Sequence, residues 1–146
     1  MPGALALQMP RALAFLGVLG AVSILPPYVG PAVGLELFGI SSTVEVVDHV
    51  VPGLTVIAFS VIALLLLRGG RQSDSLPLLF AVAVCMLAGL WETTSHVPLL
   101  FEAGEPEAPW GTVLMHSLVG PAVLALSIAL LARMLGPRPG GEQPSP

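Results

Sequence analysis

Charge is scarce in this sequence. Charged residues make up 10% of the 146 residues, hydrophobic residues make up 55%, and the mean hydropathy is +0.92. A soluble domain of this length needs more polar side chains to cover its surface, so the composition predicts an exterior that faces lipid. Lysine is absent, the net charge is −4 and no run of basic residues occurs, which excludes nucleic acid as a partner.

Cysteine is also nearly absent. The single cysteine, Cys85, lies inside an apolar stretch. One thiol excludes an intramolecular disulfide, a CxxC redox pair and a metal site built from thiolates.

Four long apolar runs divide the chain. They extend from Ala12 to Leu35, from His49 to Leu67, from Ser75 to about Leu100, and from Ala108 to Ala132. Each is close to the roughly 20 residues that a helix needs to cross a membrane. They predict an all-α, polytopic membrane four-helix bundle in residues 1–136, built from two tandem transmembrane hairpins at about 11–68 and 75–135. The Pro/Gly-rich tail, 137–146, is predicted to be a disordered cytoplasmic tail.

The first run has two interpretations. It resembles a signal peptide with a cleavage site after residues 21–23, although its apolar part is longer than such a segment should be. The alternative is a retained first helix. The prolines between Pro26 and Pro31 predict that this helix kinks or ends near Leu25.

The charges are distributed unevenly along the chain. Every basic residue falls near a terminus or between the second and third runs: Arg11, Arg68, Arg71, Arg133 and Arg138. The positive-inside rule then places both termini in the cytoplasm, in a bacterial plasma membrane. Most acidic residues belong to the opposite side: Glu36, Glu45, Asp48, Glu92, Glu102, Glu105 and Glu107.

The second and fourth runs match without gaps at an offset of 67 residues (116 minus 49). The motif H-x3-G-x2-V-x3-S occurs in both, as His49, Gly53, Val56 and Ser60, and as His116, Gly120, Val123 and Ser127. Its steps of 4, 3 and 4 place these residues on one helix face. The third run repeats the steps at Cys85, Gly89, Glu92 and His96. We predict a duplicated hairpin whose glycines let helices approach closely.

Histidines and carboxylates cluster near the extracytoplasmic ends of the last three runs. The candidate site residues are Glu45, Asp48, His49, Glu92, His96 and His116. Helix geometry puts the three histidines at similar depth and stacks Glu92 and His96 on one face. No basic residue lies on this side, so a carboxylate buried there must either take up a proton or bind a cation.

The first functional hypothesis is a transition-metal site. The three histidines are predicted to ligate zinc, copper or iron. Glu92 either ligates the metal or acts as a general base, and Asp48 or Glu45 orients an imidazole ring. Glu45 has a second interpretation as a helix cap, because it follows Ser42 by three residues. Such a site serves catalysis if a coordination position is open, and metal handling or structure if it is closed.

Two further hypotheses differ in kind. One is a b-type haem held by His49 and His116, with Gly53 and Gly120 making room for the macrocycle. It leaves His96 without a role and supplies no arginine for the propionates. The other is a cofactor-free accessory or scaffold subunit that associates with membrane protein partners or with further copies of itself. Transport or proton relay is a remaining class.

Three prolines lie close to the histidines. In a helix, each proline releases the carbonyl four residues earlier. The released carbonyls are those of Asp48, Thr94 and Ser117, and they are predicted either to orient the imidazoles or only to ease the helix ends.

Overall fold

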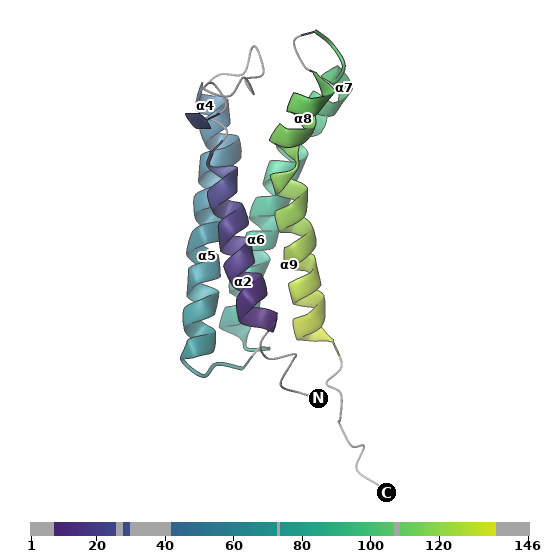
Figure 1. The fold of residues 1–146 in the computed structure, drawn as a ribbon. Helices are drawn as coiled ribbons and strands as arrows, with labels where there is room; N and C mark the ends of the chain where they lie inside the picture. The colour runs from purple at the N-terminus through teal and green to yellow at the C-terminus, as the bar shows by residue number, and fades with distance from the viewer. Residues whose placement is uncertain (1–7, 26–27, 30–41, 73, 107–108, 137–146) are drawn as a thin grey trace, which may run out of the picture.

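The computed structural model describes residues 8–25, 28–29, 42–72, 74–106 and 109–136, and these contain helices but no strand. Four helical segments follow one another along the chain (Figure 1). The first is α2 (Gln8–Ser23), and the second runs from α4 (Ser42–Glu45) through a π-helix, η1 (Val46–Val50), into α5 (Val51–Arg68). The third joins α6 (Leu76–Ser95) to α7 (Val97–Glu102), and the fourth joins α8 (Trp110–Ser117) to α9 (Val119–Leu135). The prediction of an all-α chain is confirmed.

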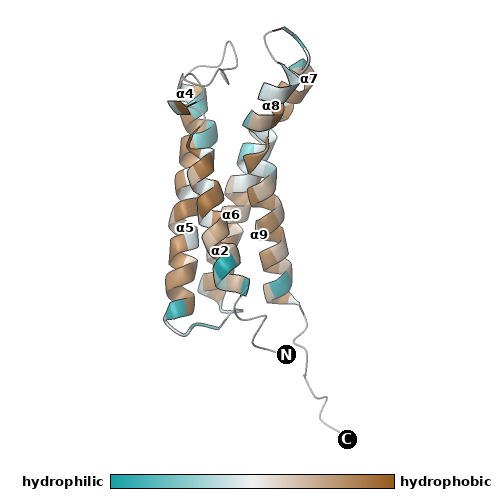
Figure 2. Ribbon diagram, in the orientation of Figure 1, coloured by the Kyte–Doolittle hydropathy of each residue, from teal (hydrophilic) through white to brown (hydrophobic). Residues whose placement is uncertain are grey.

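Three stretches of the described chain are long and apolar enough to cross a membrane: Thr43–Arg68, Leu76–Glu102 and Trp110–Leu135. Figure 2 shows their apolar character along the helices. The remaining helix, α2, has 16 residues and ends at Ser23, close to the predicted end near Leu25. Glu36 and most of the first run beyond Leu25 lie outside the described residues, as does the tail 137–146.

The four long helices pack in a closed ring. Helix α2 contacts α5, α5 contacts α6, α6 contacts α9, and α9 contacts α2 again. Each segment buries one strip of side chains with steps of 4, 3, 4 and 3, a period of about 3.5 that keeps neighbouring helices in contact along their length. The strips are Met9, Leu13, Leu16, Gly20 and Ser23; His49, Gly53, Val56, Ser60 and Ala63; Leu78, Val82, Cys85, Gly89 and Glu92; and His116, Gly120, Val123, Ser127 and Leu130.

Glycines mark the points where helices approach most closely. A Cβ atom added to Gly20 would lie 2.8 Å from the carbonyl oxygen of Gly53, and one added to Gly53 would lie 2.6 Å from that of Gly20. On the other side of the ring, a Cβ on Gly89 or on Gly120 would lie 2.7 Å from a backbone nitrogen of the facing helix. The prediction that Gly53, Gly89 and Gly120 bring helix backbones together is confirmed, and Gly20 is a further position of this kind.

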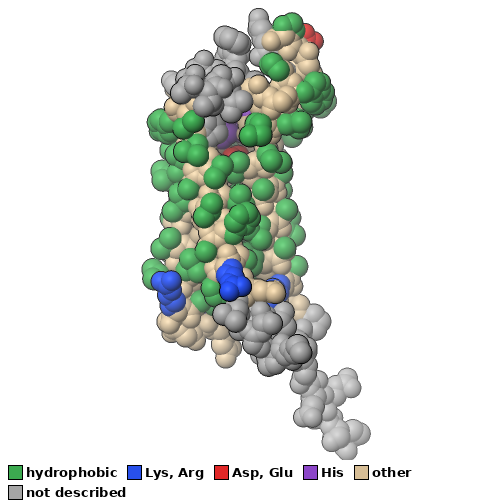
Figure 3. All heavy atoms as spheres, in the orientation of Figure 1, with side chains coloured by type: hydrophobic (Ala, Val, Ile, Leu, Met, Phe, Trp, Pro, Cys, Tyr) green, Lys and Arg blue, Asp and Glu red, His purple; other side chains and the backbone are tan. Residues whose placement is uncertain are grey.

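The two ends of the molecule differ in charge. The arginine side chains lie at the end where α2 and α6 begin and α5 and α9 finish (Figure 3). One of them, Arg133, donates from Nη1 to Oε1 of Gln8 at 3.1 Å and so links α9 to the start of α2. The histidines lie at the other end, where none of the described arginines is found.

Candidate metal centre

A departure from regular α-helix positions His49. The residue lies in the π-helix, where the N–H of Val51 bonds to the carbonyl of Val46 five residues back. Pro52 follows and has no N–H to donate, so the usual bond to the carbonyl four residues back cannot form. The wider π turn accommodates this loss, and π turns of this kind are frequent at functional sites.

His96 occupies the junction between α6 and α7. Its backbone N–H bonds to the carbonyl of Thr94, which leaves the carbonyl of Glu92 without its usual helical donor. The ring takes that place, because Nδ1 of His96 lies 2.6 Å from the Glu92 carbonyl oxygen. The carbonyl that orients this imidazole is therefore that of Glu92 and not the predicted one of Thr94.

His116 sits just before another interruption. Helix α8 ends at Ser117 and α9 begins at Val119, with Leu118 between them. Pro121 explains the break, because its ring clashes with the carbonyl of Ser117 and it cannot donate to it. All three histidines thus lie at or beside a helix irregularity that a nearby proline creates.

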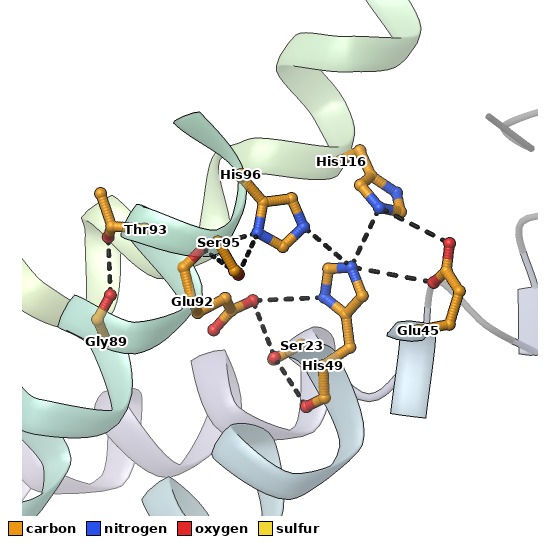
Figure 4. A network of polar contacts seen from close by, with 9 residues as sticks. All are labelled: Ser23, Glu45, His49, Gly89, Glu92, Thr93, Ser95, His96 and His116. Atoms are coloured by element: carbon orange, nitrogen blue, oxygen red, sulfur yellow. Dashed lines mark hydrogen bonds and ion pairs between the residues drawn. The ribbon is translucent and has the colours of Figure 1, made fainter. Parts of the chain in front are cut away.

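The three imidazoles converge (Figure 4). Nε2 of His49 lies 3.0 Å from Nε2 of His116 and 3.1 Å from Nε2 of His96. One ring nitrogen from each residue falls within 4.8 Å of the other two, so the group can hold a metal ion. Two imidazole nitrogens bound tetrahedrally at about 2.0–2.1 Å from zinc are about 3.3 Å apart, close to the two separations that involve His49. The three residues are 1% (His49), 3% (His96) and 7% (His116) exposed.

Hydrogen bonds alone do not account for this arrangement. Nδ1 of His96 faces a carbonyl, which only accepts, so Nδ1 carries the proton and Nε2 of the neutral ring carries the lone pair. Nε2 of His49 faces two other ring nitrogens, yet it has a single proton or a single lone pair in the ring plane. Both contacts cannot be good hydrogen bonds. A cation among three lone pairs satisfies all of them.

Two carboxylates approach the cluster from different sides. Glu45 of α4 faces the converging nitrogens, with Oε2 3.8 Å from Nε2 of His49 and Oε1 3.7 Å from Nε2 of His116. Glu92 of α6 lies behind His49, with Oε1 3.4 Å from Nδ1. That separation exceeds a normal N–H···O hydrogen bond, so the contact is an electrostatic one. The carboxylates therefore address opposite nitrogens of the same ring.

Each of these two carboxylates has one buried oxygen without a hydrogen-bond partner among the described residues. Glu92 is 2% exposed, and its Oε2 has no hydrogen-bond partner among the described residues; neither has Oε2 of Glu45. The four arginines that the structure describes lie near the start of α2, at or just after the end of α5, and near the end of α9, which is the other end of the molecule. A buried carboxylate without a positive charge nearby is costly, so these groups are expected to take up a proton or to lie beside a cation.

A pocket of about 130 Å³ opens beside the histidines. Its lining residues are Val44, Glu45, Asp48, His49, Ser95, His96, Pro98, Leu99 and His116. Histidine and acidic side chains are visible from outside between the upper ends of the helices in Figure 3. Asp48 is half-buried and lines the pocket, whereas Glu102 and Glu105 are exposed and lie outside it.

The structure adds one residue that the sequence did not point to. Ser23 of α2 is fully buried, and its Oγ lies 2.8 Å from Oε1 of Glu92 and 3.1 Å from the carbonyl oxygen of His49. Helix α2 has no acidic residue that could correspond to Glu92. Ser23 holds the corresponding place in its buried strip, three residues after Gly20, as Glu92 follows Gly89. This shared spacing is the feature of the sequence that could have identified Ser23 as a site residue.

Comparison with protein-family models, with curated proteins and with solved structures finds no match to this chain. The function is therefore argued from the geometry of the site.

We expect Ser23→Ala to weaken metal binding by about 10- to 100-fold, the usual effect of removing a group that supports a ligating histidine from behind. The substitution frees Oε1 of Glu92 and lets the carboxylate move away from His49. Ser127→Ala is the matched control: Ser127 is equally buried, and its Oγ has no hydrogen-bond partner among the described residues. Competition titration with a chromophoric chelator measures both variants. Equal affinities for the two would contradict a supporting role for Ser23.

Proposed function

We propose that the protein is an integral membrane protein that holds one transition-metal ion near the extracytoplasmic surface. The membrane part is supported by three long apolar stretches and by the apolar side chains that cover the outside of the helices (Figure 3). The arginines gather at one end, as expected for the cytoplasmic side of a bacterial plasma membrane. Both termini then lie in the cytoplasm, and the histidines face the opposite side.

We further propose that residues 1–136 form a transmembrane four-helix bundle of two tandem hairpins that arose by duplication. The matching 4-3-4-3 strips support this, as does a close glycine crossing within each half, Gly20 with Gly53 and Gly89 with Gly120. A first helix that packs on α5 and α9 and contributes Ser23 to the site supports a retained helix over a cleaved signal. His49 and His116, the paired residues of the repeat, meet at the site.

The metal ligands in this proposal are His49, His96 and His116, with Glu45 as the fourth. The single observation that carries it is the burial of three histidines whose ring nitrogens converge within 4.8 Å. A divalent ion balances the charges of Glu45 and Glu92 and needs no other cation. Three imidazoles and a carboxylate suit zinc, copper(II) or iron(II) and do not suit magnesium or calcium.

Glu92 has an orienting role in this proposal. Its carboxylate contacts Nδ1 of His49, the nitrogen that points away from the other imidazoles, and its carbonyl accepts from Nδ1 of His96. Carboxylates and carbonyls behind ligating histidines fix the tautomer and the ring direction. A general base would have to face the pocket instead, and Glu45 and Asp48 are the acids that do so.

The pocket decides how the site can be used. Glu45 lies 3.7–3.8 Å from the nearest histidine nitrogens, so it can approach a bound ion or withdraw and leave a position to a ligand from the pocket. Exchange of the fourth ligand suits metal uptake and release at the outer surface, and it also suits catalysis on a small substrate. We favour metal handling, because a pocket of about 130 Å³ is small for an organic substrate.

The haem hypothesis finds little support in the geometry. A bis-histidine haem holds its two imidazoles on opposite faces of a macrocycle. The rings of His49 and His116 instead contact each other, with centroids 4.5 Å apart and planes at 83°. His96, which haem ligation leaves idle, makes equal contact with His49.

The test is direct. We expect protein purified in detergent to contain stoichiometric zinc, copper or iron by elemental analysis, and His96→Ala or His116→Ala to lose that metal. Glu105→Ala, an exposed acid outside the pocket, is the control and should retain it. A Soret band in the absorption spectrum would select haem. If the folded protein contains no metal, and its histidine variants fold and function like the wild type, then the cofactor-free scaffold hypothesis would be the one supported.

A further inference from the structure

A second pocket lies at the opposite end of the molecule, between α2 and α5. It has a volume of about 330 Å³ and is lined by Pro10, Arg11, Ala14, Leu64, Leu67 and Arg68. Figure 1 shows these two helices side by side at the end where α2 begins and α5 finishes. The pocket combines two guanidinium groups with apolar walls, which is the composition expected for an amphipathic, negatively charged ligand.

The two arginines are available for such a ligand. Arg11 and Arg68 are exposed, and neither makes a hydrogen bond or ion pair with any residue in the described ranges. Arg133, by contrast, is engaged by Gln8. Among the described residues at this end, the only acid is Asp74, and it already has a contact of its own. The positive charge of the two arginines at this pocket therefore favours an anionic ligand.

The apolar residues that line the pocket indicate that the rest of the ligand is apolar. Ala14 lies three residues after Arg11, and Leu64 lies four residues before Arg68, so each arginine has an apolar neighbour on its own helix face. Leu67 also lines the pocket. These walls extend from the arginines toward the middle of the apolar stretch. A free phosphate fills only the charged part of this space, whereas a lipid fills both parts.

We propose that this pocket binds an anionic phospholipid, with the phosphate between Arg11 and Arg68 and an acyl chain along Ala14, Leu64 and Leu67. Guanidinium groups bind phosphate oxygens through two parallel hydrogen bonds, and basic pockets between membrane helices on the cytoplasmic side are typical sites for anionic headgroups. The inference rests on the proposed membrane embedding and is independent of the metal site, which lies at the other end of the bundle.

The experiment is native mass spectrometry of the full chain, released from detergent and titrated with phosphatidylglycerol or phosphatidylcholine. We expect phosphatidylglycerol to bind preferentially, and Arg11→Gln/Arg68→Gln to weaken its binding by about 30-fold, the product of two lost charge contacts. Arg11→Lys/Arg68→Lys keeps the charges and should retain most of the preference. Arg71→Gln, which removes an arginine outside the pocket at the same end, is the matched control and should change binding less than about twofold.

The alternative outcomes are distinguishable. Equal binding of the two lipids, or equal weakening by Arg71→Gln, would overturn the site and leave general surface attraction. Displacement of the lipid by inorganic phosphate would show that the occupant is a free anion. Co-flotation of the protein with liposomes tests membrane embedding separately, and metal content measured on the same samples tests the histidine site. Failure of the lipid site alone therefore leaves the proposed function untouched.

Discussion

His49→Ala is expected to reduce the metal content of the purified protein to near zero, the largest effect of any single substitution at the site. His49 is the central ring of the cluster, because its Nε2 contacts the Nε2 atoms of both His96 and His116. Its loss leaves His96 and His116 without the ring that contacts both of them, and Glu45 as the only other proposed ligand. It also leaves the buried carboxylate of Glu92 without the contact from Nδ1. Both binding and stability should fall, since an unpaired buried charge is strongly destabilising.

The measurement must separate loss of a ligand from loss of the fold. Ser60→Ala is a suitable control, because Ser60 lies on the same strip as His49 but away from the cluster. Elemental analysis gives the metal content, and circular dichroism during heating gives the unfolding midpoint. A chelator should lower the midpoint of the wild type and of Ser60→Ala, and leave that of His49→Ala unchanged, because only bound metal stabilises the folded state. Full metal content in folded His49→Ala would refute the proposed site.

The helices were predictable because each is encoded by a long run of apolar residues, so no single residue decides the assignment. An apolar run of 20 or more residues has few alternatives to a helix in lipid, so the last three runs were identified with little ambiguity. The first run was harder, because prolines at its far end interrupt the helical pattern and α2 keeps only 16 residues. The sequence displayed three strips with steps of 4, 3 and 4, in the last three runs, and the buried strip of α2 was not identified from it.

The convergence of the histidines was partly predictable and their detailed roles were not. Similar depth on three helices follows from counting residues, and the structure brings His49, His96 and His116 together. Which ring nitrogen faces inward depends on rotation of each side chain and on local departures from helix geometry. The π turn at Val46–Val50 and the contact of the His96 ring with the carbonyl of Glu92 are such departures, and no spacing rule specifies them.

A serine in an apolar helix does not by its position in the sequence indicate which role it has. Ser23 could be a surface residue, a helix bend or a buried donor, and the sequence alone favours none of these. Its role became visible only when α2 was placed against α5 and α6, where its Oγ reaches both Glu92 and the carbonyl of His49. The contact depends on how closely α2 approaches α5, and Gly20, three residues earlier in the same helix, determines that distance.

Gly20→Ala is therefore expected to destabilise the protein by about 1–3 kcal/mol, the usual cost of overpacking a tight interior. The new methyl group would lie 2.8 Å from the carbonyl oxygen of Gly53 and 3.0 Å from the Cβ of Val56. Backbone atoms cannot rotate out of the way, so α2 must move away from α5. Thermal unfolding in detergent, compared with the wild type under the same conditions, measures the change.

Gly17→Ala supplies a control of opposite sign in the same helix. Its methyl group would lie 3.6 Å from the Cβ of Ser60, an ordinary contact, so the higher helix propensity of alanine should stabilise the protein by up to about 1 kcal/mol. The two substitutions also differ at the metal site. Displacement of α2 by Gly20→Ala carries Ser23 away from Glu92 and should weaken metal binding, whereas Gly17→Ala should leave it unchanged. If both variants unfolded at the same temperature and bound metal equally, then the Gly20–Gly53 crossing would not control the position of Ser23.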